Sequence, residues 1–177
     1  LADPEVIRAL YEASAEGVKI DLVVRGICCL RAGVPGLSEN ITVQSIVDRF
    51  LEHSRIYYFE NACQPEVFIA SADWLPRNFF RRIEVAFPIE DGVLRERVVK
   101  EFLGVTLADN TKARALQPDG TYRLGAPANG EQPRRSQADF ISLALSDPTP
   151  LGTKNSPKAR YPKMTLAPAP GRVEGRR

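Results

Sequence analysis

The chain has 177 residues, of which 44% are hydrophobic and 26% are charged, and its formal net charge is +2. It is long enough for one domain with a hydrophobic core, and it has no apolar run near the ~20 residues that span a bilayer. Three cysteines, two of them adjacent, and a single histidine argue against a disulfide framework and a zinc site, and they favour a reducing cytoplasm.

Charge is divided unevenly along the chain. Seven Lys or Arg and two Asp or Glu lie from Asp147 onward, which gives this part +5 and the remainder −3. Residues 147–177 also hold six of the fourteen prolines, so we expect a domain over 1–146 and a basic, Pro-rich, disordered tail over 147–177. The negative domain argues against a nucleic-acid surface and favours a local anion site. Because the chain starts at Leu1, we expect it to be processed or part of a longer one.

The predicted elements alternate between helix and strand. Asp3-Pro4 predicts the start of a helix over 3–15, and the apolar run after it predicts a strand over 18–24 that is covered on both faces. A glycine- and proline-containing loop follows over 32–39, and apolar spacing predicts a second helix over 41–51.

The second half continues this alternation. We expect a hairpin of strands over 55–60 and 66–71, a strand over 82–87 ended by Pro88, a helix over 90–103 with Leu94, Val98, Phe102 and Leu103 inward, short strands over 111–116 and 121–124, and a last helix over 136–145. This order predicts an α/β fold, with a mixed sheet because of the hairpin.

Arg25 follows the first predicted strand, at the edge where open α/β sheets bind ligands. Gly26 beside it allows close backbone approach. The alternative is a surface arginine paired to a carboxylate, and position alone does not separate the two.

The only histidine, His53, precedes the hairpin, and Arg55 faces the same side of the strand. With Glu60 and the later Ser71, these residues form a degenerate version of the His-x-Lys-x4-Asp…Gly-Ser signature of the phospholipase D superfamily. Histidine can attack phosphorus or transfer a proton, and guanidiniums hold phosphate oxygens. The alternative is a histidine that caps a helix or is satisfied in the core.

Further polar residues surround the next strand end. Asp73 is placed to orient an arginine, whereas Trp74, the only tryptophan, suits a core role. Arg82 and Glu84 face one side of the following strand, so Glu84 can position Arg82 through a bidentate pair. The alternative is a solvated charge cluster over Arg77, Arg81 and Arg82.

Four segments, over 18–41, 45–61, 71–74 and 82–85, closely resemble the C-terminal catalytic domain of bacterial polyphosphate kinases of the type 1 family. The resemblance is strong over residues 5–90 and extends to about 146. It implies a phospholipase D-like mixed sheet flanked by helices on both faces. It also implies reversible transfer of the terminal phosphate of ATP to inorganic polyphosphate, through a phosphohistidine in an upstream domain.

The resemblance assigns His53 as the second essential histidine and places Arg25 and Arg82 on phosphates, with Arg55, Ser71 and Glu84 as further candidates. It implies Mg²⁺ as cofactor, with no metal ligand in this chain. The partners it implies are ATP or ADP, polyphosphate, the upstream domains of the same enzyme and, in the full-length protein, further copies of that protein. With one histidine, the chain alone is expected to be inactive.

Two departures from the family pattern concern local structure. Asn61-Ala62-Cys63 replaces an Asn-Gly-Gly turn, and Phe80 stands where an aspartate is expected. Two other functions stay open from the residues alone, a phospholipase D-type phosphodiesterase and a non-catalytic polyphosphate- or nucleotide-binding module.

Overall fold

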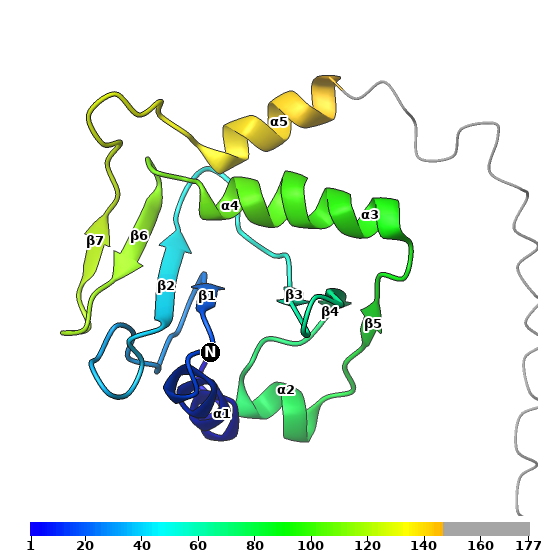
Figure 1. Cartoon of the computed structure of the whole chain (residues 1–177). Coiled ribbons are helices and arrows are strands. Elements are labelled where there is room, and N and C mark those ends of the chain that lie inside the picture. Colours follow the sequence, from blue (N-terminus) through cyan, green and yellow to red (C-terminus); the bar gives the residue numbers. More distant parts are fainter. Residues whose placement is uncertain (147–177) are drawn as a thin grey trace, which may run out of the picture.

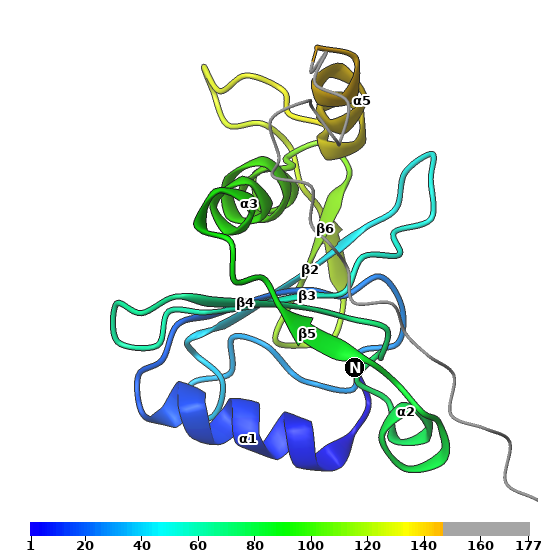
Figure 2. The ribbon, with the colours of Figure 1, turned by 90° about the vertical axis from the view of Figure 1, so that its right-hand side faces the viewer.

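The computed structural model describes residues 1–146, and the predicted tail over 147–177 lies outside the described residues. Strands form a middle layer between two layers of helices (Figure 1 and Figure 2). On one side lie α1 (Pro4–Ala15) and α2 (Pro76–Arg81), and on the other lie α5 (Ser136–Ser146) and the helix that begins with α3 (Gly92–Arg97). The predicted α/β class with helices on both faces is therefore confirmed.

The strands belong to two sheets. The first has the order β1-β2-β6-β7 and consists of β1 (Ile20–Val23), β2 (Ile41–Ile46), β6 (Ala113–Leu116) and β7 (Tyr122–Leu124). Because β1 and β2 are parallel while the other two pairs are antiparallel, this sheet is mixed. The two short strands expected over 111–116 and 121–124 are confirmed as β6 and β7.

The second sheet is antiparallel, with the order β3-β4-β5. Its strands are β3 (Ile56–Phe59), β4 (Glu66–Ala70) and β5 (Ala86–Pro88). The predicted hairpin is confirmed as β3 and β4, with Ile56 opposite Ile69. The first sheet is mixed because β6 pairs antiparallel with β2, which is itself parallel to β1. The hairpin belongs to the other sheet and does not make it mixed.

Helix α1 begins where the sequence predicts. The Asp3 carboxylate accepts hydrogen bonds from the N–H groups of Glu5 and Val6, both at 3.1 Å, and Pro4 occupies the first helical position. Ile7 and Leu10 on this helix pack against a core of buried residues, two of them in β2: Leu30, Ala32, Ile41 and Val43.

The helix predicted over 41–51 is wrong, because residues 41–46 form strand β2. Its apolar residues do fall at helical spacing, but Ile41, Val43 and Ile46 are β-branched and are buried between β1 and β6. Residues 47–55 then run without helix or strand to β3, and this segment carries His53.

Strand β1 is covered on one face only, contrary to the prediction. It lies at an edge of its sheet, Ile20 and Leu22 are half-buried, and Asp21 and Val23 are exposed. The continuous apolar run therefore does not mark a strand buried on both sides.

The segment before β5 also differs from the prediction. Residues 76–81 form α2, with Pro76 at its start, and the strand over 82–87 shortens to Ala86–Pro88. β5 ends at Pro88, as predicted, but this proline is its last residue and pairs with Phe68. Since β5 is an edge strand, proline can occupy it without removing a ladder hydrogen bond.

The helix expected over 90–103 is confirmed and is longer than predicted. α3 continues as the π-helical η1 (Val98–Gly104) and then α4 (Val105–Leu107). Leu94, expected to face inward, is 49% exposed. Phe102 stacks on Phe140 with ring centroids 4.9 Å apart, and this contact joins the long helix to α5, the predicted last helix. None of the described helices is both long and apolar enough to cross a membrane.

Candidate functional site

Four polar side chains from three separate parts of the chain meet at the ends of β1, β3 and β4. Arg25 follows β1, His53 and Arg55 precede β3, and Asp73 follows β4. Antiparallel pairing of β3 with β4 puts the start of one beside the end of the other, which brings Arg55 and Asp73 together. The sequence predicts each of these residues as functional or orienting, and the fold collects them in one place.

Asp73 is bound by both arginines. One oxygen accepts a hydrogen bond from Arg55 Nε at 2.9 Å, and the other lies 3.8 Å from Arg25 Nη2. The Arg55 hydrogen bond, with the charges of Arg55 and Arg25, holds the pKa of Asp73 below its ordinary value against partial burial. The carboxylate therefore stays ionised and orients two guanidiniums. The sequence predicts that Asp73 orients one arginine.

His53 is exposed and contacts Arg55 twice. The Nη1 atom of Arg55 lies 3.1 Å from His53 Nδ1 and donates to the His53 carbonyl at 3.2 Å. A guanidinium can only donate, so Nδ1 is the acceptor and Nε2 carries the proton of the neutral ring. An Nε2–H group on an exposed ring is suited to donate to an anionic oxygen.

Arg25 is held from a second side by the main chain. Its Nη1 atom donates to the carbonyl of Glu52 at 2.5 Å, one residue before His53. No pattern in the sequence indicates this contact, because the acceptor is a backbone atom 27 residues away. The bond ties the end of β1 to the His53 segment.

Ser71 and Glu84 bind each other. Glu84 accepts hydrogen bonds from Ser71 Oγ at 2.5 Å and from the buried Asn78 at 2.6 Å, and Ser71 Oγ accepts the N–H of Val85 at 3.0 Å. These hydrogen bonds from Ser71 and Asn78, with the charges of Arg82 and Arg55, lower the pKa of Glu84. The group fastens the end of β4 to the chain entering β5.

The predicted bidentate pair of Arg82 with Glu84 is wrong: these two side chains form no ion pair, and Glu84 instead accepts from Ser71 and Asn78. Arg82 is exposed, and within residues 1–146 it has no carboxylate within 4.0 Å. Its guanidinium is thus open to an anion from solution.

Trp74, which follows Asp73, and Tyr57 of β3 form a stacked pair. Their ring centroids are 5.1 Å apart with an angle of 4° between the planes, and the Tyr57 hydroxyl donates to the carbonyl of Ala72 at 3.0 Å. The Trp74 carbonyl accepts from Ala2 and Asp3. Trp74 is half-buried and is not among the buried core residues, so the core role expected for it is not confirmed. Its contacts support the backbone on either side of Asp73.

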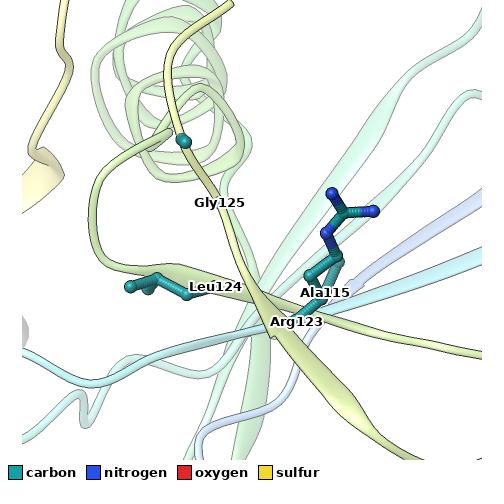
Figure 3. A pocket seen from close by; sticks show the side chains of 5 residues that line it. Ala115, Arg123, Leu124 and Gly125 are labelled. Carbon is teal, nitrogen blue, oxygen red and sulfur yellow. The ribbon is translucent and has the colours of Figure 1, made fainter.

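A cavity of about 280 Å³ lies elsewhere, on β6 and β7. It is lined by Ala115, Arg123, Leu124, Gly125 and Ala126 (Figure 3). It contains none of the predicted site residues. Nor do residues 1–146 contain any group of three or more His, Cys, Asp or Glu side chains arranged to hold a metal ion.

Comparison with known proteins gives a consistent result. The family model described as polyphosphate kinase C-terminal domain 2 matches residues 1–137. Proteins named polyphosphate kinase from Synechocystis, Pseudomonas aeruginosa and Neisseria meningitidis serogroup B are 52%, 55% and 57% identical over 149, 141 and 143 residues. These alignments cover 84%, 80% and 81% of this chain but only 20%, 20% and 21% of the relatives. The chain thus spans about a fifth of their length.

A solved structure agrees with this result. The crystal structure of polyphosphate kinase from Porphyromonas gingivalis has a TM-score of 0.77 and 44% identity, and the match covers 82% of this chain and 22% of that chain. With this TM-score and identity, the two proteins share the arrangement of helices and strands. The phospholipase D-like fold expected from the sequence is therefore confirmed.

Proposed function

This chain belongs to the polyphosphate kinase family, and we propose that it supplies one half of a phosphotransfer site that acts on ATP and inorganic polyphosphate. The observation that carries the proposal is the arrangement of Arg25, His53 and Arg55 around Asp73. Two oriented guanidiniums can stabilise the charge of a transferring phosphoryl group, and an exposed imidazole beside them can exchange a proton with it.

The arginines would hold phosphate oxygens. Each guanidinium has five N–H donors, and the contacts to Asp73, Glu52 and His53 leave donors of Arg25 and Arg55 for an anion. Exposed Arg82 adds a third cation, and Ser71 and Glu84 support it by fixing the chain on either side of α2. Because Glu84 is itself an anion and is hydrogen-bonded to Ser71, we assign both residues a supporting position beside the phosphates.

The proposed reaction uses two histidines, one as the nucleophile and one as the proton-transfer group. This chain has only one histidine, so the other must come from elsewhere in the polypeptide. A nucleophilic histidine nitrogen from the rest of the polypeptide would attack the γ-phosphorus of ATP. A P–N bond forms, the bond to the bridging oxygen breaks, and ADP leaves with the electron pair. The phosphoryl group then passes to the terminal oxygen of polyphosphate, and the reverse sequence regenerates ATP. His53 would donate or accept a proton, or hydrogen-bond the phosphoryl group in transit.

Mg²⁺ does not fit residues 1–146 as a site of its own. The Asp73 carboxylate is bound by two arginines, and the described residues offer no cluster of metal-ligating side chains. In proteins Mg²⁺ is commonly held by one or two carboxylates together with substrate phosphates. An ion that accompanies the nucleotide would therefore take its protein ligands from outside this chain.

The same proposal includes the partners and the compartment. The remaining four fifths of the family's length would provide the phosphorylated histidine, and the full-length protein would assemble with further copies of itself. Cys28, Cys29 and Cys63 are free thiols, which favours a reducing compartment such as the cytoplasm.

Replacement of His53 tests the proposal. In the complete natural polypeptide that carries this chain, we expect His53→Ala to lower polyphosphate formation from ATP by about 10²–10⁴-fold, as the loss of a proton-transfer group does. Ser54→Ala, at the exposed neighbouring position, is the matched control and should retain wild-type turnover. Near-normal turnover of His53→Ala would remove His53 from the reaction.

A further inference from the structure

The segment that carries His53 is not held by its own apolar side chains. Residues 47–55 have neither helix nor strand, and Phe50 and Leu51 within it are 53% and 77% exposed. A segment of this kind needs polar contacts to other elements to keep one position. Those contacts come from the start of α5, more than 80 residues further along the chain.

Gln137, in the first turn of α5, makes three hydrogen bonds to this segment. Its Oε1 atom accepts the N–H of Phe50 at 2.8 Å, and its Nε2 atom donates to the Phe50 carbonyl at 2.9 Å and to Glu52 Oε1 at 2.6 Å. Both amide donors are thus used, and the residue is 5% exposed. Pairing with both main-chain groups of Phe50 fixes the backbone there in the way a neighbouring strand would.

These bonds reach His53 through one residue. Glu52 is bound by Gln137 at its side chain and by Arg25 at its carbonyl, and His53 follows directly. On the other side of the ring, Arg55 binds His53 and is itself held by Asp73. The imidazole therefore lies between two anchored points.

The start of α5 is itself firmly held. Asp109 accepts the N–H and the hydroxyl of Ser136, both at 2.8 Å, and its other oxygen accepts three N–H groups of residues 111–113. Arg135 forms a two-bond ion pair with Asp48, at 2.5 and 2.8 Å, where the His53 segment begins. Gln137 can thus transmit a fixed position from the first sheet to the segment.

We infer that Gln137 is a positioning residue for His53, which acts by holding Phe50 and Glu52 so that the imidazole lies against the phosphates. This inference rests on the proposed function of His53. It concerns the same phosphotransfer reaction. It also means that α5 supports the site, although α5 lies more than 80 residues after His53 in the sequence.

The test uses the complete natural polypeptide that carries this chain, with polyphosphate formation from ATP as the readout. We expect Gln137→Ala to lower kcat about 10- to 100-fold, the size of effect that a small misplacement of a reacting group produces. The KM for ATP should change by less than about threefold, because the residue contacts no substrate. Gln132→Ala, at an exposed glutamine before α5, is the matched control and should behave as wild type.

A double variant separates positioning from a general structural role. If Gln137 acts through His53, then Gln137→Ala in the His53→Ala background should cost nothing further. A further loss there would overturn the inference, as would wild-type kcat in Gln137→Ala alone, and both leave the proposed function standing. Wild-type turnover of His53→Ala would instead overturn the proposed function and the inference with it.

If Gln137→Ala does not fold, Glu52→Ala carries the same test. It removes one of the three hydrogen bonds of Gln137 at a half-buried position. A loss of kcat of about two- to fivefold that vanishes in the His53→Ala background supports the inference. Turnover equal to that of Gln132→Ala overturns it.

Discussion

The Asp73 carboxylate accepts a 2.9 Å hydrogen bond from Arg55 Nε, although 18 residues separate the two along the chain. The same guanidinium uses its Nη1 atom to contact the ring and the carbonyl of His53. The Asp73 carboxylate therefore fixes the Arg55 guanidinium, and the guanidinium in turn contacts the His53 imidazole. Asp73 thus influences His53 through Arg55.

Replacing Asp73 should impair the reaction more than the fold. Asp73→Asn keeps the size of the side chain but removes the charge that holds Arg55 and Arg25. We expect polyphosphate formation in the complete polypeptide to fall about 10- to 100-fold, because Arg55 loses its fixed orientation beside His53. The free energy of unfolding should fall by about 1 kcal/mol or less, as for other partly exposed ion pairs.

Asp139→Asn is the control for Asp73→Asn, since Asp139 is an exposed carboxylate on α5. It should retain both activity and stability. An Asp73→Asn enzyme with wild-type turnover would show that the Arg55 orientation seen here does not matter for the reaction.

Asp109 should make the domain sensitive to acid. Burial opposes ionisation of its carboxylate, but hydrogen bonds from the N–H groups of Lys112, Ser136 and Thr111 and from the Ser136 hydroxyl outweigh it, and the pKa of Asp109 is lowered. An aspartate with a lowered folded-state pKa stabilises the fold fully above its unfolded pKa of about 3.9, and this stabilisation is lost as pH falls through the folded pKa.

We therefore expect the free energy of unfolding to decrease below about pH 4, and less steeply in Asp109→Asn than in the wild type. At pH 7 the same variant should be less stable by about 2 kcal/mol, because an amide N–H₂ cannot accept the bonds that one carboxylate oxygen takes from Ser136. Denaturant unfolding at several pH values measures both effects. Equal acid sensitivity of wild type and variant would mean that another group dominates.

The hairpin turn carries backbone strain that glycine should relieve. Asn61, Ala62 and Cys63 have φ values of 46°, 51° and 67°, the left-handed region that costs an L-residue about 1–2 kcal/mol. We expect Ala62→Gly to raise the free energy of unfolding by about 0.5–1 kcal/mol, after the entropy cost of glycine is subtracted. Ala13→Gly within α1 should do the opposite and lower it by about 1 kcal/mol. A fall in stability on Ala62→Gly would contradict this account.

Local signals explain what could be predicted of this fold. Asp3-Pro4 marks the start of α1, and two short apolar runs, 56–59 and 67–70, mark the hairpin, because caps and short strands are signalled by neighbouring residues. β2 was not predictable in this way. Its residues match helical spacing, and only pairing with β1 and β6, which are distant in sequence, makes them a strand.

The site shows the same division. Arg25, His53, Arg55 and Asp73 are recognisable from the family pattern, and the orientation of an arginine by Asp73 is as predicted. The Arg82–Glu84 pair was predicted from alternation along a strand, but α2 ends at Arg81 and Glu84 turns to Asn78. Gln137 has no local signal at all, because its partners lie 85–87 residues away.

The 177-residue chain by itself should not make polyphosphate from ATP. Its one histidine cannot serve both as the nucleophile that takes the phosphoryl group and as the second histidine beside the arginines. The measurement is polyphosphate formation by the purified chain under conditions in which the complete polypeptide is active. Its arginines should still bind polyphosphate weakly, and this binding should weaken with salt because it is electrostatic.

Three results would contradict this account, each in a different way. Polyphosphate formed by the chain alone would show that His53 itself takes the phosphoryl group. Hydrolysis of a generic phosphodiester by a dimer of the chain would favour a phospholipase D-type activity, in which two copies pair their histidines. Polyphosphate binding that survives His53→Ala, together with full turnover of His53→Ala in the complete polypeptide, would make this domain a binding module. The chain, its His53→Ala variant and the complete polypeptide measured together separate these cases.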